Sequence, residues 1–341
     1  MKSRNRTVDV VRGFAMLLVV LGHTMSGSTV EYQNSFLFQV IWTLQMPLFI
    51  IISGYVTRYS QPITNGETLW KFIKKRSLAY LLPWAVWTYM IRGVIFGQSS
   101  FFDFKYLFWH MDSGYWFLIT IWTISMIYAI SDYVANKFSI QISRNILLHL
   151  FICTMGMSGL FLLGMILGFN FFSVKLSLYY FPFYLLGYLY GHLQDWLFAR
   201  KDSKIIIDII STTFWAIWLF LIVRYDFYSG NDSGLFILFR FFASIVGCIA
   251  IISLLVGINN QKVKFFHWSG VHSLEIYLTH YLFLNMIKVK IPSSLMTLDG
   301  IIVLVINFVL TLVFTIIIIR LIQNNNIMNY LLYGKKVRQS V

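Results

Sequence analysis

Apolar runs long enough to cross a lipid bilayer recur along the whole chain, and they constrain its fold more than any other feature. A helix rises about 1.5 Å per residue, so about 20 apolar residues span the hydrocarbon core. The candidate runs cover residues 8–28, 36–57, 77–97, 115–132, 146–168, 176–192, 205–224, 235–257, 272–288 and 299–322. They predict an all-α, polytopic membrane helical bundle of about ten transmembrane helices.

The composition excludes a soluble protein. Of the 341 residues, 58% are hydrophobic and 12% are charged, whereas soluble domains carry about 25% charged residues. Basic residues precede the first apolar run, as in a secretory signal peptide. However, Asp9 and Arg12 interrupt its start, and no clear small-residue cleavage site follows. We therefore expect this run to be a retained membrane span.

The net charge of +14 is explained by membrane topology rather than by nucleic-acid binding. If the N-terminus is cytoplasmic, 19 of the 27 Lys and Arg residues fall on the cytoplasmic side and five fall outside. The other three, Arg12, Arg92 and Arg240, lie in or near predicted spans. This bias predicts that both termini are cytoplasmic. It also predicts a basic inner rim that binds anionic membrane lipids.

The connections between the runs are short, which predicts one membrane domain over residues 1–341. Its core covers about residues 5–322, and residues 323–341 form a short cytoplasmic tail. We expect no appended soluble domain. Cys153 and Cys248 lie inside predicted spans without motif spacing, so we interpret them as packing residues rather than as a disulfide or metal site.

Three polar residues stand out in the first span. Arg12 and His23 are eleven residues apart, which leaves a net rotation of about 20° and a separation of about 16 Å along a helix. They therefore share one helix face. Arg12 can form a structural ion pair with Asp9, or it can provide an anion site at the cytoplasmic mouth. His23 can be a structural histidine, or it can transfer protons near neutral pH.

The second and third runs contain further candidates. In the sequence MPLFIIISGY, residues 46–55, Pro47 predicts a bent helix. Ser53 is interpreted mainly as a packing residue, because small residues allow close helix approach. Lys75 and Arg76 stand immediately before the third run. They are explained by the positive-inside rule alone, or they hold the phosphates of a nucleotide-bearing substrate.

The segment HSLEIYLTHYLF, residues 272–283, places Glu275 and His280 in a predicted span. Ionisable groups inside a membrane indicate a functional site, although these two could also simply pair with each other. The aromatic segments 115–118 and 180–191 are explained by packing. The sequence has no zinc-ligand cluster, phosphate-binding loop or dinucleotide fingerprint, so we expect no metal and no bound cofactor.

These motifs together resemble the acyltransferase 3 family of integral membrane acyltransferases, and the N-terminus is most similar to its fucose 4-O-acetylase-like branch. The first match combines Asp9, Arg12 and Gly13 with VVLGH, residues 19–23. The second is MPLF followed by Ser53, Gly54 and Tyr55. Later matches are WFL at 116–118, Phe183 with LGY at 186–188, and SLEIYLTH at 273–280. The resemblance covers about residues 5–285.

The resemblance implies an enzyme that moves an acetyl group from cytoplasmic acetyl-CoA to a sugar hydroxyl of a cell-envelope or exported glycan. The acceptor would be lipid-linked or in the outer leaflet of the plasma membrane. His23 matches the catalytic residue of the family and Arg12 a residue linked to the acyl donor. Asp9, Lys75 and Arg76 are assigned to the donor site, and Ser53, Tyr55, Trp116, Glu275 and His280 are candidates for lining the cavity.

The chain departs from the family pattern at one position. Many members have a second arginine three residues after the position of Arg76, where this chain has Ala79. Lys74 and Lys75 can supply charge there, but a lysine lacks the bidentate fork of arginine. Some members carry an extra extracytoplasmic hydrolase-like domain, and this sequence shows none, so the expectation is a stand-alone membrane acyltransferase.

A rival hypothesis is a glycan or lipid-linked sugar transporter, flippase or polymerase, in which the intramembrane Arg, His and Glu residues serve a substrate path or a proton relay. A carrier would more naturally show paired repeats with interrupted helices, and the sequence shows none. The residues 98–114, with Asp103, His110 and Asp112, are a weaker candidate for the acceptor surface.

Overall fold

The computed structural model is helical, as predicted. It describes residues 5–89, 97, 109, 111, 114–138, 142–168, 171–197, 203–228, 233–257, 263–284, 286, 293–294 and 297–335. Asp103, His110 and Asp112 lie outside the described residues. Within them, the only strands are β1 (Thr29–Val30) and β2 (Ser293–Ser294), which pair in parallel. The all-α membrane fold is therefore confirmed.

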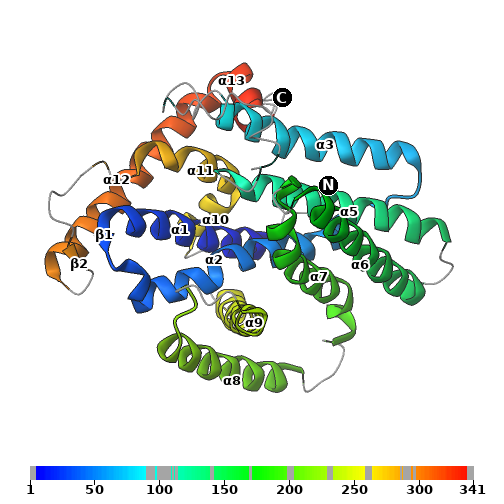
Figure 1. Cartoon of the computed structure of the whole chain (residues 1–341), viewed down its shortest axis with the longest axis horizontal. Helices are drawn as coiled ribbons and strands as arrows, with labels where there is room; N and C mark the ends of the chain where they lie inside the picture. Colours follow the sequence, from blue (N-terminus) through cyan, green and yellow to red (C-terminus); the bar gives the residue numbers. More distant parts are fainter. Residues whose placement is uncertain are drawn as a thin grey trace. The chain divides into compact units, whose positions relative to one another are not determined.

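The chain divides into two compact units, which are described separately. The first comprises Met1–Tyr55 and Gly187–Leu321. Its helices (Figure 1) are α1 (Arg6–Ser28), α2 (Phe36–Tyr55), the second part of α7 (Val174–Leu197), α8 (Ser203–Arg224), α9 (Gly234–Gly257), α10 (Lys264–Val271), α11 (Ser273–Thr279) and α12 (Leu298–Gln323), with the 3₁₀ turns η1 (Tyr32–Asn34) and η6 (His280–Phe283).

The second unit comprises Val56–Leu186 and Ile322–Val341. Its elements are η2 (Val56–Tyr59), α3 (Gly66–Ala85), α5 (Trp116–Phe138), α6 (Ile142–Leu167), η5 (Phe171–Ser173), the first part of α7 and α13 (Asn326–Tyr333). Helix α5 packs against both α3 and α6, and α13 packs against α3. Gly334 ends α13 with φ +63°, where its backbone approaches Leu78.

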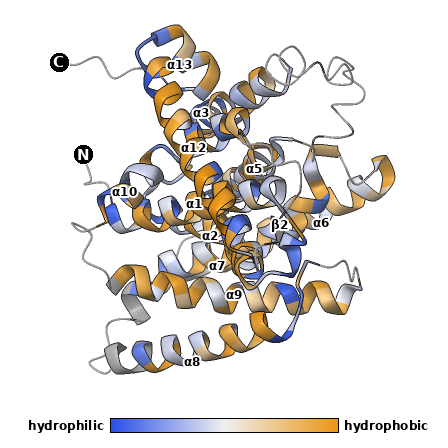
Figure 2. Ribbon diagram, turned by 90° about the vertical axis from the view of Figure 1, so that its left-hand side faces the viewer, coloured by the Kyte–Doolittle hydropathy of each residue, from blue (hydrophilic) through white to orange (hydrophobic). Residues whose placement is uncertain are grey.

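Helix α1 is the centre of the first unit. It packs against α2, α9, α10 and α11, and α8 packs against α9. Hydrophobic residues dominate α9 (Figure 2). The crossing of α1 and α10 is so close that a Cβ atom on Gly13 would lie 1.8 Å from the carbonyl oxygen of Phe266, and one on Gly270 would lie 1.8 Å from that of Asp9. Only glycine allows this backbone contact, so it sets the register between the two helices.

Six helices of the described chain are long and apolar enough to cross a membrane. Their spans are Arg6–Ser28, Phe36–Tyr59, Trp116–Phe138, Ile146–Leu167, Gly234–Val256 and Leu298–Gln323. All six coincide with predicted spans. Helices α7 and α8 also cover predicted runs, with 24 and 22 residues.

On α12 a stripe of polar side chains faces the protein, and apolar side chains face outward. Asn307, Thr311 and Thr315 recur every four residues and are fully buried, whereas Val305, Val309, Val313 and other aliphatic residues are exposed. The buried stripe bonds to neighbouring elements, since Asn307 Nδ2 donates to Ser28 Oγ at 3.0 Å and Thr311 Oγ1 donates to the Phe283 carbonyl at 3.0 Å. A polar inner stripe with an apolar outer surface is expected where lipid surrounds the helix.

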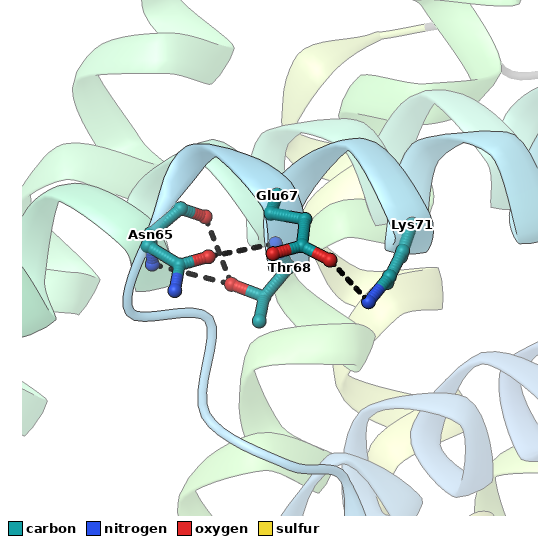
Figure 3. A network of polar contacts seen from close by, with 4 residues as sticks. All are labelled: Asn65, Glu67, Thr68 and Lys71. Atoms are coloured by element: carbon teal, nitrogen blue, oxygen red, sulfur yellow. Dashed lines mark hydrogen bonds and ion pairs between the residues drawn. The ribbon is translucent and has the colours of Figure 1, made fainter.

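Two predicted spans differ in form from the observed helices. The third was expected to begin near residue 77, but α3 begins at Gly66 because Asn65 caps it. The Asn65 side chain accepts from Thr68 N at 2.9 Å, and Asn65 N donates to Thr68 Oγ1 at 3.2 Å (Figure 3). This capping box starts the helix well before the apolar run. Lys75 and Arg76 therefore lie within a helix and not on a loop.

The predicted span 272–288 is not one continuous helix. His272 separates α10 from α11, and its backbone leaves the helical region (φ −105°, ψ 20°). The chain tightens into η6 at His280, and Leu284 is extended. Because a 3₁₀ turn has three residues per turn, it turns its side chains differently from a continuing α-helix.

Candidate active site

The site is built around the unbroken helix α1, which carries Asp9, Arg12 and His23. The predicted helical spacing is therefore confirmed, and Arg12 and His23 lie about 16 Å apart along its axis. His23 stands near the C-terminal end of α1, and Asp9 and Arg12 stand near the N-terminal end. Asp9 is buried, while Arg12 and His23 each keep part of their surface exposed.

The ring of His23 on α1 contacts two rings of η6, those of His280 and Tyr281. Tyr281 Oη and His23 Nε2 form a hydrogen bond of 2.8 Å, and their ring centroids are 4.8 Å apart. The His280 ring lies 5.4 Å from that of His23 and 4.4 Å from that of Tyr281. Turn η6 thus places two side chains against the histidine of α1.

His280 has a defined tautomer. Its Nδ1 donates to the carbonyl oxygen of Ile276 at 2.8 Å, so the neutral ring presents Nε2 as a hydrogen-bond acceptor. His280 is completely buried, and its Nε2 has no hydrogen-bond partner among the described residues. The structure thus brings His280, a predicted cavity-lining residue, to His23.

Two histidine–carboxylate pairs involve α10 and α11: one joins α1 to α10, and the other joins the residue between α10 and α11 to α11. Asp9 Oδ2 is 3.6 Å from His267 Nε2, and Glu275 Oε1 is 3.3 Å from His272 Nδ1. Both carboxylates are almost completely buried. The sequence suggested that Glu275 could pair with His280; the observed contact is with His272 instead. Buried carboxylates need such partners, because an isolated buried charge is costly.

Ser53 and Tyr55 lie where α2 crosses α7. Ser53 Oγ donates to the Phe49 carbonyl at 2.7 Å, within its own helix. Tyr55 Oη donates to Gln194 Oε1 at 3.2 Å. A Cβ atom on Gly187 would lie 1.9 Å from the Ile51 carbonyl oxygen, so the two helices touch through their backbones. These contacts agree with the packing interpretation of Ser53.

The remaining candidates belong to the second unit. Arg76 Nη1 donates to Tyr80 Oη at 3.0 Å, and its guanidinium lies over the rings of Phe72 and Tyr80. Lys75 is exposed. Trp116 stacks on Tyr180, with ring centroids 5.6 Å apart and an interplanar angle of 16°. No group of three or more potential metal-ligating side chains occurs in the described part of the chain.

Sequence reasoning did not single out Tyr281, His267 or His272. Tyr281 was quoted only as part of the segment 272–283, and nothing in its spacing indicated a contact with a residue 258 positions away. A weak signal was present, because the segment combines several ring side chains with ionisable groups in a predicted span.

A family model described as an acyltransferase domain matches residues 5–320. The chain belongs to the acyltransferase 3 family. The match covers both the α1 motif and the segment containing Glu275 and His280, so the resemblance inferred from those motifs is confirmed. The candidate spans make the chain a membrane member of this acyltransferase family.

Two curated relatives are similar to parts of the chain. Nodulation protein NolL of Mesorhizobium japonicum is 26% identical over 205 residues, which cover 57% of this chain and 50% of that protein. Nodulation protein NolL of Sinorhizobium fredii is 31% identical over 109 residues, which cover 30% of this chain and 28% of that protein. The chain thus spans half or less of the length of these relatives. No solved structure matches it significantly.

Proposed function

We propose that this acyltransferase 3 family member is a membrane O-acetyltransferase that moves an acetyl group from cytoplasmic acetyl-CoA to a sugar hydroxyl of a cell-envelope or exported glycan. The observation that carries the proposal is the position of His23. This histidine lies on the same continuous helix as Arg12, it is partly exposed, and its imidazole is hydrogen-bonded to Tyr281. This arrangement suits a reaction in which an anionic donor binds near Arg12, at the N-terminal end of α1, and a proton is transferred at His23, nearer the C-terminal end.

Arg12 and the basic residues of the predicted cytoplasmic side supply the charge that a coenzyme A donor requires. Guanidinium groups bind phosphate through a planar fork, which supports Arg12 and Arg76 in the donor role. The long, thin pantetheine arm of the donor would then extend along α1 toward His23. The membrane in question is proposed to be the plasma membrane.

At His23 two routes lead to the same products. As a general base, the imidazole takes the proton of the sugar hydroxyl while its oxygen attacks the acetyl carbonyl carbon. The carbon–sulfur bond breaks, and the leaving thiolate of coenzyme A receives the proton. As a nucleophile, the imidazole attacks the acetyl carbonyl carbon first, and the carbon–sulfur bond breaks as the thiolate of coenzyme A leaves. The sugar oxygen then takes the acetyl group from the imidazole, and the proton of the sugar hydroxyl passes by way of the freed imidazole to the thiolate. Trapping of a labelled acetyl group on the protein separates the two routes.

The first test measures the O-acetyl content of envelope glycans by NMR in cells lacking the protein. The cells are rescued with wild type, His23→Ala or His192→Ala. His192 is a matched control because its Nδ1 bonds only within its own helix, to the Tyr188 carbonyl. We expect wild type and His192→Ala to restore an O-acetyl signal and His23→Ala, present in equal amount, to restore less than about a hundredth of it.

A different result would favour the rival function. If acetylation is unchanged in the deleted cells while the amount or length of the glycan changes, the protein is a carrier or polymerase. A second assay follows coenzyme A thiol release from acetyl-CoA by membranes with envelope glycan fractions. A carrier would release no thiol, whereas the proposed transferase releases it in step with O-acetylation.

A further inference from the structure

We infer that Tyr281 is a positioning residue for His23, holding the imidazole by Nε2 so that Nδ1 is the nitrogen that acts on the substrate. This inference rests on the proposed catalytic role of His23. Its starting point is the 2.8 Å contact between Tyr281 Oη and His23 Nε2, which is the shorter of two contacts, since the same hydroxyl lies 3.5 Å from His23 Nδ1.

The ring of Tyr281 is held from two sides. It lies 4.8 Å from the ring of His23 and 4.4 Å from the ring of His280. His280 is itself immobilised, since it is completely buried and bonded to the Ile276 carbonyl. A side chain whose neighbours are fixed in this way loses little entropy when it bonds, so its hydroxyl has a defined place beside His23.

The backbone carrying Tyr281 is also fixed from outside. The tightening of the helix into η6 leaves backbone carbonyl groups that need new hydrogen-bond partners. One of them is the carbonyl of Phe283, which accepts a hydrogen bond of 3.0 Å from Thr311 Oγ1 of α12. The rings of Phe283 and Phe314 stack at 5.6 Å. Helix α12 therefore supports the turn that brings Tyr281 to α1, and preorganised support of this kind is what a catalytic imidazole requires.

The direction of the hydrogen bond follows from the chemistry required. A phenol hydroxyl can donate or accept. If it donates to Nε2, the basic nitrogen of neutral His23 is occupied. If Nε2–H instead donates to Tyr281 Oη, Nδ1 keeps its lone pair for the sugar proton or the acetyl group. The second arrangement is the productive one, and Tyr281 then selects the tautomer of His23.

The same bond strengthens as the reaction proceeds. When Nδ1 takes the sugar proton, His23 becomes an imidazolium, and its Nε2–H forms a charge-assisted bond that is roughly twice as strong. The sugar oxygen bonds to the acetyl carbon, the carbon–sulfur bond breaks, and Nδ1 returns the proton to the thiolate. An interaction that is stronger in the transition state raises kcat rather than donor affinity.

The test compares Tyr281→Phe with Tyr277→Phe in purified full-length protein, with acetyl-CoA and glycan fraction from the deleted cells. Both changes remove one hydroxyl; Tyr277 lies one turn earlier on α11, with its ring 6.2 Å from that of His280. We expect Tyr281→Phe to lower kcat about tenfold or more while KM for acetyl-CoA stays within about twofold. Tyr277→Phe should keep kcat within about twofold.

A readout independent of turnover covers the case in which Tyr281→Phe is poorly active for structural reasons. Diethyl pyrocarbonate modifies unprotonated imidazole nitrogens, and mass spectrometry resolves the modified histidine. In the wild type Nδ1 carries the free lone pair, and its basicity depends on the acceptor that Tyr281 gives to Nε2–H. Loss of the Tyr281 hydroxyl should therefore lower the rate of modification at His23 severalfold and leave that at His267 unchanged. Tyr281→His, which keeps a hydrogen-bonding ring, should recover part of the kcat.

The outcomes separate the inference from the proposed function. An active His23→Ala enzyme overturns both. An inactive His23→Ala with full kcat in Tyr281→Phe overturns only the role of Tyr281. Equal losses in Tyr281→Phe and Tyr277→Phe, or an unchanged modification rate at His23, would reduce Tyr281 to a packing residue.

Discussion

The surroundings of His23 and those of Arg76 differ in how the polar side chain is held. His23 on α1 meets a hydroxyl 258 residues later in the chain. Arg76 on α3 instead bonds to Tyr80 and covers Phe72, both one turn away on its own helix. Long-range contacts fix one geometry of the folded protein, whereas contacts one helical turn apart form whenever the helix forms.

This difference indicates where the protein needs precision. An imidazole that moves protons requires its partner atoms within tenths of an ångström, and the α1 region has such constraints from α10, α11 and η6. A cation that attracts phosphates acts over a longer range and tolerates movement. The exposed Lys75 next to Arg76 is consistent with this looser role.

The largest effect is expected from the close crossing of α1 and α10. Gly270→Ala puts a Cβ 1.8 Å from the Asp9 carbonyl oxygen, so α1 must shift. Overpacking of this kind costs about 1–3 kcal/mol or more. We expect a lower midpoint of thermal unfolding and a loss of most transferase activity. Gly159→Ala on α6 is the control, because nothing lies within 4 Å of the added atom. Equal stability of the two variants would contradict a rigid crossing.

A smaller effect is expected at the basic stretch of α3. Arg76→Ala should raise KM for acetyl-CoA about tenfold, because it removes a charge-assisted donor from the proposed phosphate site. Lys75→Ala should raise KM no more than about threefold, since an exposed point charge is screened by salt. Initial rates at varied acetyl-CoA and ionic strength test this pair. A drop in kcat with unchanged KM would instead connect Arg76 to the chemical step.

The smallest effects are expected at the N-terminus of α3, where Asn65 bonds to Thr68 and Glu67 pairs with Lys71 within one helix (Figure 3). Asn65→Ala removes the helix cap and should cost about 1 kcal/mol. Lys71→Ala breaks the exposed ion pair with Glu67 and should cost about 0.3–0.5 kcal/mol. Thermal unfolding in detergent measures both. A larger loss for Lys71→Ala than for Asn65→Ala would mean that the ion pair contributes more than surface pairs normally do.

Much of the fold could be predicted from apolar run length, because in lipid every spanning segment must satisfy its own backbone hydrogen bonds. The common face of Arg12 and His23 followed from helical periodicity alone. The early start of α3 was missed although Asn65 and Thr68 form a readable cap signal. That error arose because run length was given more weight than capping.

The site could be predicted only in part, for a physical reason. Periodicity within one segment says which residues share a face, but not which distant segment meets that face. The change from α-helix to 3₁₀ turn at His280 adds about 20° per residue to the rotation, and no composition signal marks it. Tyr281 thus became visible only once α1 and η6 were placed together.

The separation of His23 and Tyr281 along the chain has a consequence for biosynthesis. At about 5–20 residues per second, a ribosome needs about 13–50 s to make the 258 residues between them. During that interval the histidine of α1 has neither Tyr281 nor the support of α12. A nascent chain, or one truncated before residue 281, therefore lacks the contact that holds the His23 ring in the complete chain.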